Sequence, residues 1–283
     1  MKIEFAKMEG LGNDFIIMDD RSGDIKAAIS YSELAQKLCH RRFGIGGDGI
    51  ILLVNSQDHD CRFRIFNCDG TEPEMCGNGM RCFAKYLYEK GIVTTQKIRV
   101  ETLAGTVIPE VITDENNSVT SVCVDMGEPE LTCSKIPFIC DQERCVNLSL
   151  DLGEEALPIT MVSMGNPHAV TFVPDAGAVP LKELGPRVEN HQRFPEKTNV
   201  EFVQVLSDSE LRMRVWERGA GITLACGTGA CAVLVAAHLN GHIGRSARLH
   251  LDGGDLDVRW DEETNHIFKT GPAQLVFESS IQI

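Results

Sequence analysis

The sequence predicts an α+β protein made of two pseudo-symmetric halves, each a curved mixed β-sheet or barrel wrapped round one central α-helix. Three observations support this prediction: an internal repeat, helical periodicity directly after each copy of it, and short strand-like runs over most of the remaining chain. The chain has 283 residues, more than the usual size of one domain. Its 43% hydrophobic and 24% charged residues are ordinary for a folded globular protein. We therefore expect two compact units, each with its own core.

The repeat consists of two Cys-Gly-x-Gly segments, one in each half of the chain. Their cysteines, Cys76 and Cys226, are separated by 150 positions. The same offset relates three pairs of glycines: Gly77 and Gly227, Gly79 and Gly229, Gly91 and Gly241. Chance rarely keeps four positions aligned, so the two halves are interpreted as copies of one structural unit.

A helix about three turns long is predicted after each copy of the motif. Four apolar residues of the first copy follow the i, i+3, i+4, i+7 spacing: Met80, Phe83, Ala84 and Leu87. Residues 230–239 are apolar almost all round, which predicts a buried second helix. Each run ends at a glycine, Gly91 or Gly241, in the position of a left-handed C-terminal cap. Each cysteine is thus expected at the N-terminal edge of its helix.

Short β-branched and alternating runs fill much of the chain outside these helices. The expected strands are Ile50–Val54, Ile98–Thr102, Thr106–Val111, Ile159–Val162, Val200–Val205, Leu211–Trp216 and Leu256–Trp260. A turn over residues 125–129 separates two strand regions, so we place the boundary there, with a first half of residues 1–128 and a second of residues 129–272.

Charge and composition exclude several classes of partner. The net charge is −14 and no basic run occurs, which argues against nucleic acid and anionic membrane surfaces. No apolar stretch approaches the roughly 18 residues of a membrane span, and the first residues lack the apolar block of a signal peptide, so a cytoplasmic location is expected. Most of the eleven cysteines are interpreted as buried thiols, five of them among apolar residues: Cys39, Cys61, Cys82, Cys123 and Cys231.

Paired cysteines at helix N-termini suit proton transfer. The helix macrodipole can lower a cysteine pKa from about 8.5 into the range of roughly 3.5–7.5. If both helix starts face one ligand, a thiolate can remove an α-proton from one face while the opposite thiol protonates the other. The alternatives are structural thiols and a metal site. We expect no metal, because Cys76 and Cys82, and Cys226 and Cys231, lack zinc-site spacing.

Seven ordered motifs extend the pattern over nearly the full length. They are Gly10-Leu-Gly-Asn-Asp-Phe15, Phe66-Asn-Cys-Asp-Gly70, Met75-Cys-Gly-Asn-Gly79, Ser163-Met-Gly-Asn-Pro-His168, Thr198-Asn199, Glu217-Arg-Gly-Ala-Gly221 and Ala225-Cys-Gly-Thr-Gly229. On these motifs the chain resembles the diaminopimelate epimerases. The resemblance implies two related halves, with residues 273–283 returning to the first. It also implies interconversion of LL- and meso-2,6-diaminopimelate for lysine and peptidoglycan synthesis, without pyridoxal phosphate or any other cofactor.

The resemblance also assigns roles to residues of this chain. Cys76 and Cys226 become the two acid/base residues, while Glu217 and His168 flank them and tune their pKa values. The implied substrate-binding residues are Asn13, Asn67, Gly77, Asn78, Asn166, Asn199, Glu217, Arg218, Gly227 and Thr228, with the Arg218 guanidinium on the distal carboxylate. The chain departs from the family at Gly49, where several members carry a glutamine that contacts the substrate.

Two other functions compete with this one. The first is a proline racemase or hydroxyproline epimerase, which uses the same cysteine pair but has His where this chain has Asn78. The second is a non-catalytic amino-acid-binding protein of the same fold. All three take a small-molecule ligand, and a homodimer is compatible with each.

Overall fold

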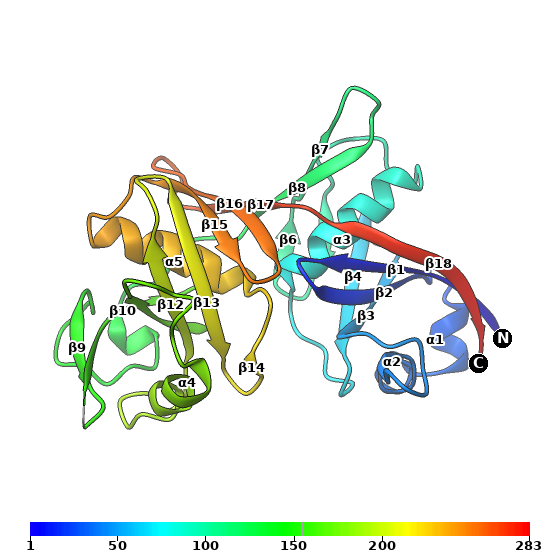
Figure 1. Ribbon diagram of the computed structural model, residues 1–283. Coiled ribbons are helices and arrows are strands. Elements are labelled where there is room, and N and C mark those ends of the chain that lie inside the picture. The colour runs from blue at the N-terminus through cyan, green and yellow to red at the C-terminus, as the bar shows by residue number, and fades with distance from the viewer. Residues whose placement is uncertain (154) are drawn as a thin grey trace. The chain divides into compact units, whose positions relative to one another are not determined.

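The computed structural model describes residues 1–153 and 155–283, which form two compact units. The first contains Met1–Val124 and Thr270–Ile283, and the second contains Asp125–Lys269. These divisions lie a few residues before the boundaries placed from the sequence, after residues 128 and 272. That the two units act as the two halves of an epimerase stays a prediction. Each unit is described here by itself (Figure 1).

The first unit is built on a seven-stranded sheet in the order β18-β1-β2-β3-β4-β5-β6. Its strands are β1 (Lys2–Gly10), β2 (Asn13–Asp19), β3 (Gly49–Val54), β4 (Cys61–Asn67), β5 (Val100–Thr102), β6 (Gly105–Val107) and β18 (Gln274–Gln282). A hairpin of β7 (Glu110–Thr113) and β8 (Val119–Asp125) follows. The helices are α1 (Asp24–Ala28), α2 (Tyr31–Cys39) and α3 (Gly77–Glu89).

Helices cover both faces of this sheet, which explains the unbroken apolar run of β3. Ile50 and Leu52 pack with α2 residues in one core cluster. Ile51 points the other way and lies beside Gly79 of α3. Because successive side chains of a strand point to opposite faces, a strand covered on both faces has apolar residues throughout.

The second unit repeats this plan around α5 (Gly227–Leu239). Its sheet has the order β17-β16-β15-β13-β12-β11-β10-β9. The strands are β9 (Leu148–Asp151), β10 (Ala156–Ser163), β11 (Pro167–Phe172), β12 (Asn199–Val205), β13 (Glu210–Glu217), β14 (Gly221–Ile222), β15 (Ser246–Leu251), β16 (Gly254–Trp260) and β17 (Ile267–Gly271), with β14 paired to β13. A 3-10 turn η1 (Cys133–Lys135) and helix α4 (Leu181–Glu189) complete it.

The predicted α+β fold with a central helix in each half is confirmed. In the first unit β2 and β3 are parallel and β3 and β4 antiparallel; β11, β12 and β13 repeat both relationships. Both central helices also end as predicted, with Gly91 at φ 64° and Gly241 at φ 74°. The amides of the next residues, Ile92 and His242, donate to the carbonyls of Leu87 and Ala237, which is the Schellman arrangement.

Several details differ from the sequence predictions. The run expected at residues 98–102 is a strand only from Val100, and the run at 106–111 is broken into β6 and β7 at Ile108–Pro109. Cys123 is half-buried rather than buried, because it lies on β8 in a hairpin with one open face. The described helices are all too short or too polar to span a bilayer.

Candidate active site

Each of the two paired cysteines is the N-cap residue of its unit's central helix. Both have extended backbone, and each Sγ accepts a hydrogen bond from the amide three residues ahead, Gly79 for Cys76 and Gly229 for Cys226, at 3.4 Å. The placement at the helix edge is therefore as predicted. The next amides, at the first turn of the helix, have no acceptor within the helix and can bind an anion.

In the first unit the structure brings Asn13 and Asn78 together. Asn13 opens β2 and Asn78 is the second residue of α3, and the Asn78 Nδ2 donates to the Asn13 Oδ1 at 3.3 Å. The fully buried Arg81 donates to the Asn78 Oδ1 at 2.9 Å, and the Asn13 Nδ2 donates to Asp48 Oδ2 at 2.6 Å. These contacts form a hydrogen-bonded series that begins at the Arg81 guanidinium and ends at the Asp48 carboxylate. Because a guanidinium only donates and a carboxylate only accepts, the two ends fix the orientations of both amide groups between them.

Asp48 is held in turn by charged neighbours. Arg41 bridges Asp48 and Asp14 at 2.7 Å each, and Lys7 donates to Asp14 at 2.6 Å. Burial raises the Asp14 pKa, but the hydrogen bonds from Arg41 and Lys7 outweigh it and bring that pKa to about 2. Asp14 is therefore a fixed negative charge that anchors this end of the network.

Asn67 is the third predicted residue of this unit, and its side chain bonds within its own turn rather than to the Asn13–Asn78 pair. It is exposed at the end of β4, and its side chain donates to the Thr71 hydroxyl at 3.0 Å within a turn. At Gly49 a Cβ would lie 2.6 Å from the Phe66 carbonyl oxygen. A side chain therefore does not fit at Gly49, and the family's glutamine contact has no counterpart there.

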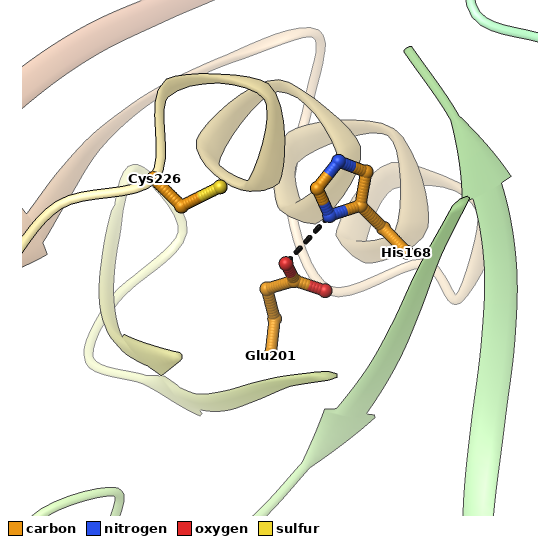
Figure 2. Close-up of side chains that lie close together, drawn as sticks. All are labelled: His168, Glu201 and Cys226. Atoms are coloured by element: carbon orange, nitrogen blue, oxygen red, sulfur yellow. Dashed lines mark hydrogen bonds and ion pairs between the residues drawn. The ribbon is translucent and has the colours of Figure 1, made fainter. Parts of the chain in front are cut away.

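In the second unit Cys226 has two ionisable neighbours that are fully buried, His168 and Glu201 (Figure 2). The His168 Nδ1 is hydrogen-bonded to the Glu201 Oε1 at 2.6 Å, and its Nε2 is hydrogen-bonded to the Asn166 Oδ1 at 3.1 Å. One donor atom of each of His168, Glu201 and Cys226 lies within 4.8 Å of the others. We assign no metal to this group, because the ring nitrogen and the carboxylate oxygen point at each other rather than at a common centre.

Glu217 is a third ionisable neighbour of Cys226. Burial raises its pKa, while a hydrogen bond from the Thr223 hydroxyl opposes the rise. Burial also raises the pKa of the Cys226 thiol well above its ordinary value, and the charges of Glu217 and Glu201 raise it further. The hydrogen bonds from Thr228 and the Gly229 amide lower it only in part. The helix-start argument alone is therefore wrong for Cys226, whose resting form at neutral pH is the thiol.

Asn199 and Arg218 are linked through the backbone. The buried Asn199 side chain accepts from the Arg218 amide at 2.9 Å and donates to the Pro167 carbonyl at 2.8 Å. Arg218 is exposed, and its guanidinium donates to the Glu196 carbonyl at 3.2 Å. Asn199 thus holds the main chain that carries Arg218. Gly227 and Thr228 form the first turn of α5, with the Thr228 hydroxyl 3.6 Å from Cys226 Sγ.

Sequence reasoning missed Glu201, Asp48 and Arg81. One signal was available for Glu201, a lone acidic residue within the apolar run of β12. Arg81 and Asp48 carried no such signal, because a charged residue on an amphipathic helix or in a turn is ordinarily solvated.

Comparison with known proteins identifies the family to which the sequence is similar. The family model described as diaminopimelate epimerase matches residues 5–132 and 160–276. The chain is 59% identical to the diaminopimelate epimerase of Desulforapulum autotrophicum over 283 residues, which is 100% of both chains. It is 52% identical to that of Heliobacterium modesticaldum over 281 residues, 99% of this chain and 100% of the relative.

Two solved structures share the fold at low identity. The first is a PhzF-family phenazine biosynthesis protein from Bacillus anthracis, with TM-score 0.68, 17% identity and 100% of both chains covered. The second is a hydroxyproline epimerase from Agrobacterium vitis, with TM-score 0.68, 16% identity, and 99% of this chain and 92% of that chain covered. They show the fold alone, whereas the sequence matches extend over both units. The chain belongs to the diaminopimelate epimerase family.

Proposed function

We propose that this protein interconverts LL- and meso-2,6-diaminopimelate in lysine biosynthesis, by proton transfer between the substrate α-carbon and two cysteines. The observation that carries the proposal is the repeated cysteine N-cap, Cys76 on α3 and Cys226 on α5. A lone thiol at a helix start has many uses. One in each half, within a family of epimerases, suits inversion at a carbon atom.

The reaction requires one thiolate and one thiol. The thiolate removes the α-proton from one face, and the thiol donates its proton to the opposite face, which inverts the centre. The product leaves the two cysteines with their protonation states exchanged. Charge that develops on the α-carboxylate is stabilised by the first-turn amides of each helix, at Gly77 and Asn78 and at Gly227 and Thr228. Both proton transfers use protein groups, so the mechanism needs no cofactor.

The remaining residues recognise the polar ends of a diamino dicarboxylate. The exposed Arg218 guanidinium suits a bidentate contact with the distal carboxylate. The amides of Asn13, Asn67, Asn78, Asn166 and Asn199 supply donors and acceptors to the substrate or to the loops that hold it. Glu217 and His168 act on Cys226 or on the substrate ammonium. The proposed partner is this small molecule, in the cytoplasm, and a homodimer stays a prediction.

The test is to incubate the reduced protein, without added cofactor, with LL-diaminopimelate in deuterated water. The proposal expects the meso isomer, with solvent deuterium at its inverted carbon. If proline or hydroxyproline exchanged its α-proton with solvent while diaminopimelate stayed unchanged, the racemase alternative would be favoured. No exchange of any amino acid, together with measurable diaminopimelate binding, would favour the non-catalytic binding protein.

A further inference from the structure

The internal repeat allows the surroundings of the two cysteines to be compared position by position. Ile50 pairs with Phe66 in the first unit, and Val200 pairs with Trp216 in the second, both at the offset of 150. Ile51 and Glu201 are therefore equivalent. An independent contact agrees, because a Cβ on Gly79 would meet Ile51 at 3.1 Å, and one on Gly229 would meet Glu201 at 2.7 Å.

The neighbouring strands give a second equivalence. In the first unit Phe15 of β2 pairs with Gly49, and in the second His168 of β11 pairs with Asn199. Gly49 and Asn199 are again 150 positions apart, so Phe15 and His168 are equivalent. In the first unit, which carries Cys76, the two positions hold the apolar residues Phe15 and Ile51. Beside Cys226 the same two positions hold a hydrogen-bonded histidine and glutamate.

The His168–Glu201 pair is costly for a protein core. Both side chains are fully buried, and among the described residues the Glu201 Oε2 has no hydrogen-bond partner. A buried carboxylate with an unpartnered oxygen destabilises a fold, and replacing buried ion pairs by apolar residues is often neutral or stabilising. The first unit has the apolar solution, Phe15 and Ile51, at the same places. A structural role therefore does not explain the charged pair.

The position of the His168–Glu201 pair beside Cys226 explains its presence better. Ionisable groups reach Cys226 from three strands: His168 of β11, Glu201 of β12 and Glu217 of β13. Both His168 ring nitrogens face acceptor oxygens, so Glu201 fixes the ring while its charge lies beside the thiol. We infer that Glu201 is a positioning residue that acts through His168 and makes the two cysteines inequivalent. In the unliganded protein Cys226 rests as the thiol and is therefore the acid of the pair, which leaves the role of base to Cys76.

Burial is the largest cause of the raised pKa of the Cys226 thiol, and the negative charges of Glu217 and then Glu201 add to it in the same direction. Only the catalytic roles given to the two cysteines, base and acid, rest on the proposed function. Their inequivalence is a property of the free protein, so it can be tested without substrate.

The test is alkylation by iodoacetamide as a function of pH, with each cysteine followed by peptide mass spectrometry. The pH midpoint reports the ionisation of a thiol separately from its accessibility. In the wild type we expect the Cys226 midpoint to lie above that of Cys76. Glu201→Gln should lower the Cys226 midpoint by about one unit, equivalent to roughly tenfold faster alkylation at neutral pH, and leave that of Cys76 unchanged.

A matched control is Glu189→Gln, which removes another buried carboxylate of the same unit, bonded to Trp216 and Gly219. It should leave both midpoints in place. A second variant, His168→Phe with Glu201→Ile, copies the residues of the first unit and should bring the midpoints closer. Equal midpoints in the wild type, or an unchanged Cys226 midpoint in both variants, would overturn the inference. Unequal midpoints without diaminopimelate turnover would remove the proposed function and keep the inference.

Discussion

Cysteine is not among the preferred N-cap residues, which are Ser, Thr, Asp and Asn. Both central helices nevertheless begin at a cysteine, with an Sγ···N distance of 3.4 Å. Serine would occupy the same place and accept the same hydrogen bond more strongly. The choice of a weaker cap at both helices indicates that the thiol is retained for its acidity.

Cys76→Ser and Cys226→Ser separate capping from catalysis. We expect each variant to keep or slightly raise the free energy of unfolding, because serine is the better cap. Epimerisation should fall by at least a factor of about 10², the usual contribution of general acid–base catalysis. Thermal unfolding and the deuterium assay measure the two effects. Loss of stability with retained activity would show that the cysteines are structural.

The glycines one turn into the two helices should differ in their tolerance of a side chain. Gly229→Ala places a methyl group 2.7 Å from the Glu201 carboxylate, whereas the nearest atom to the methyl group of Gly79→Ala is the end of the flexible Ile51 side chain at 3.1 Å. Alanine favours a helix by about 1 kcal/mol, which offsets the milder clash. We expect Gly79→Ala to be nearly neutral and Gly229→Ala to lose about 1–3 kcal/mol in denaturant unfolding. Gly244→Ala, in open space, is the control.

The central helices could be predicted closely from the sequence, because their periodicity, glycine caps and repeat all agreed. Helix α2 was missed although Ser30 and Glu33 form the Ser-x-x-Glu signature of a helix start, and the Ser30 side chain does accept from the Glu33 amide. Helix α4 was masked by Gly185 and Pro186, where Gly185 allows close packing against Trp216. Tertiary contact, which a single sequence does not display, decides such elements.

The candidate site was predictable where it lies in motifs and not where distant elements meet. Both cysteines follow from the repeat. The Asn13–Asn78 contact joins β2 to α3 across 65 positions, and its ends at Asp48 and Arg81 become meaningful only once the elements are packed. The raised pKa of Cys226 likewise comes first from its burial and then from the carboxylates of Glu217 on β13 and Glu201 on β12, all of which need the packed fold.

The hydrogen bonds that join Asn13 of β2 to Asn78 of α3, with Asp48 and Arg81 at their ends, give a prediction about how these elements shape the site. In Asp48→Asn the new amide can present a donor to Asn13, so the Asn13 and Asn78 orientations are no longer fixed. We expect KM for diaminopimelate to rise about tenfold, the effect of one hydrogen bond of about 1.4 kcal/mol, with a smaller fall in kcat. Asp19→Asn, which removes an exposed partner of Arg21, is the control. An unchanged KM would show that Asp48 does not orient the site.

For the molecule as a whole, the buried thiols should make the folded state less stable at alkaline pH. Burial raises the pKa of Cys39, Cys61, Cys82 and Cys145 to about 12 each. In the unfolded chain they ionise near 8.5. Because the thiols ionise at lower pH in the unfolded chain than in the folded protein, their contribution to the free energy of unfolding is fully present below about pH 8.5. It is lost as the pH rises from there toward the folded-state pKa of about 12.

We therefore expect the free energy of unfolding to fall between about pH 8 and pH 10, measured in denaturant at constant ionic strength. The variant Cys39→Ser together with Cys61→Ser lacks two of these ionisable groups and should show a shallower decline. A stability that is flat or rises over this interval would contradict the burial of these thiols.

The pairing of β1 with β18 has a consequence for how the protein is made. The register runs from Lys2 with Gln282 to Glu9 with Gln274, so β1 obtains this partner only after the whole second unit has been synthesised. The second unit is continuous and can complete its sheet as it leaves the ribosome. The first unit must wait with one strand edge open, a state prone to aggregation. The order of maturation is thus the reverse of the order of synthesis.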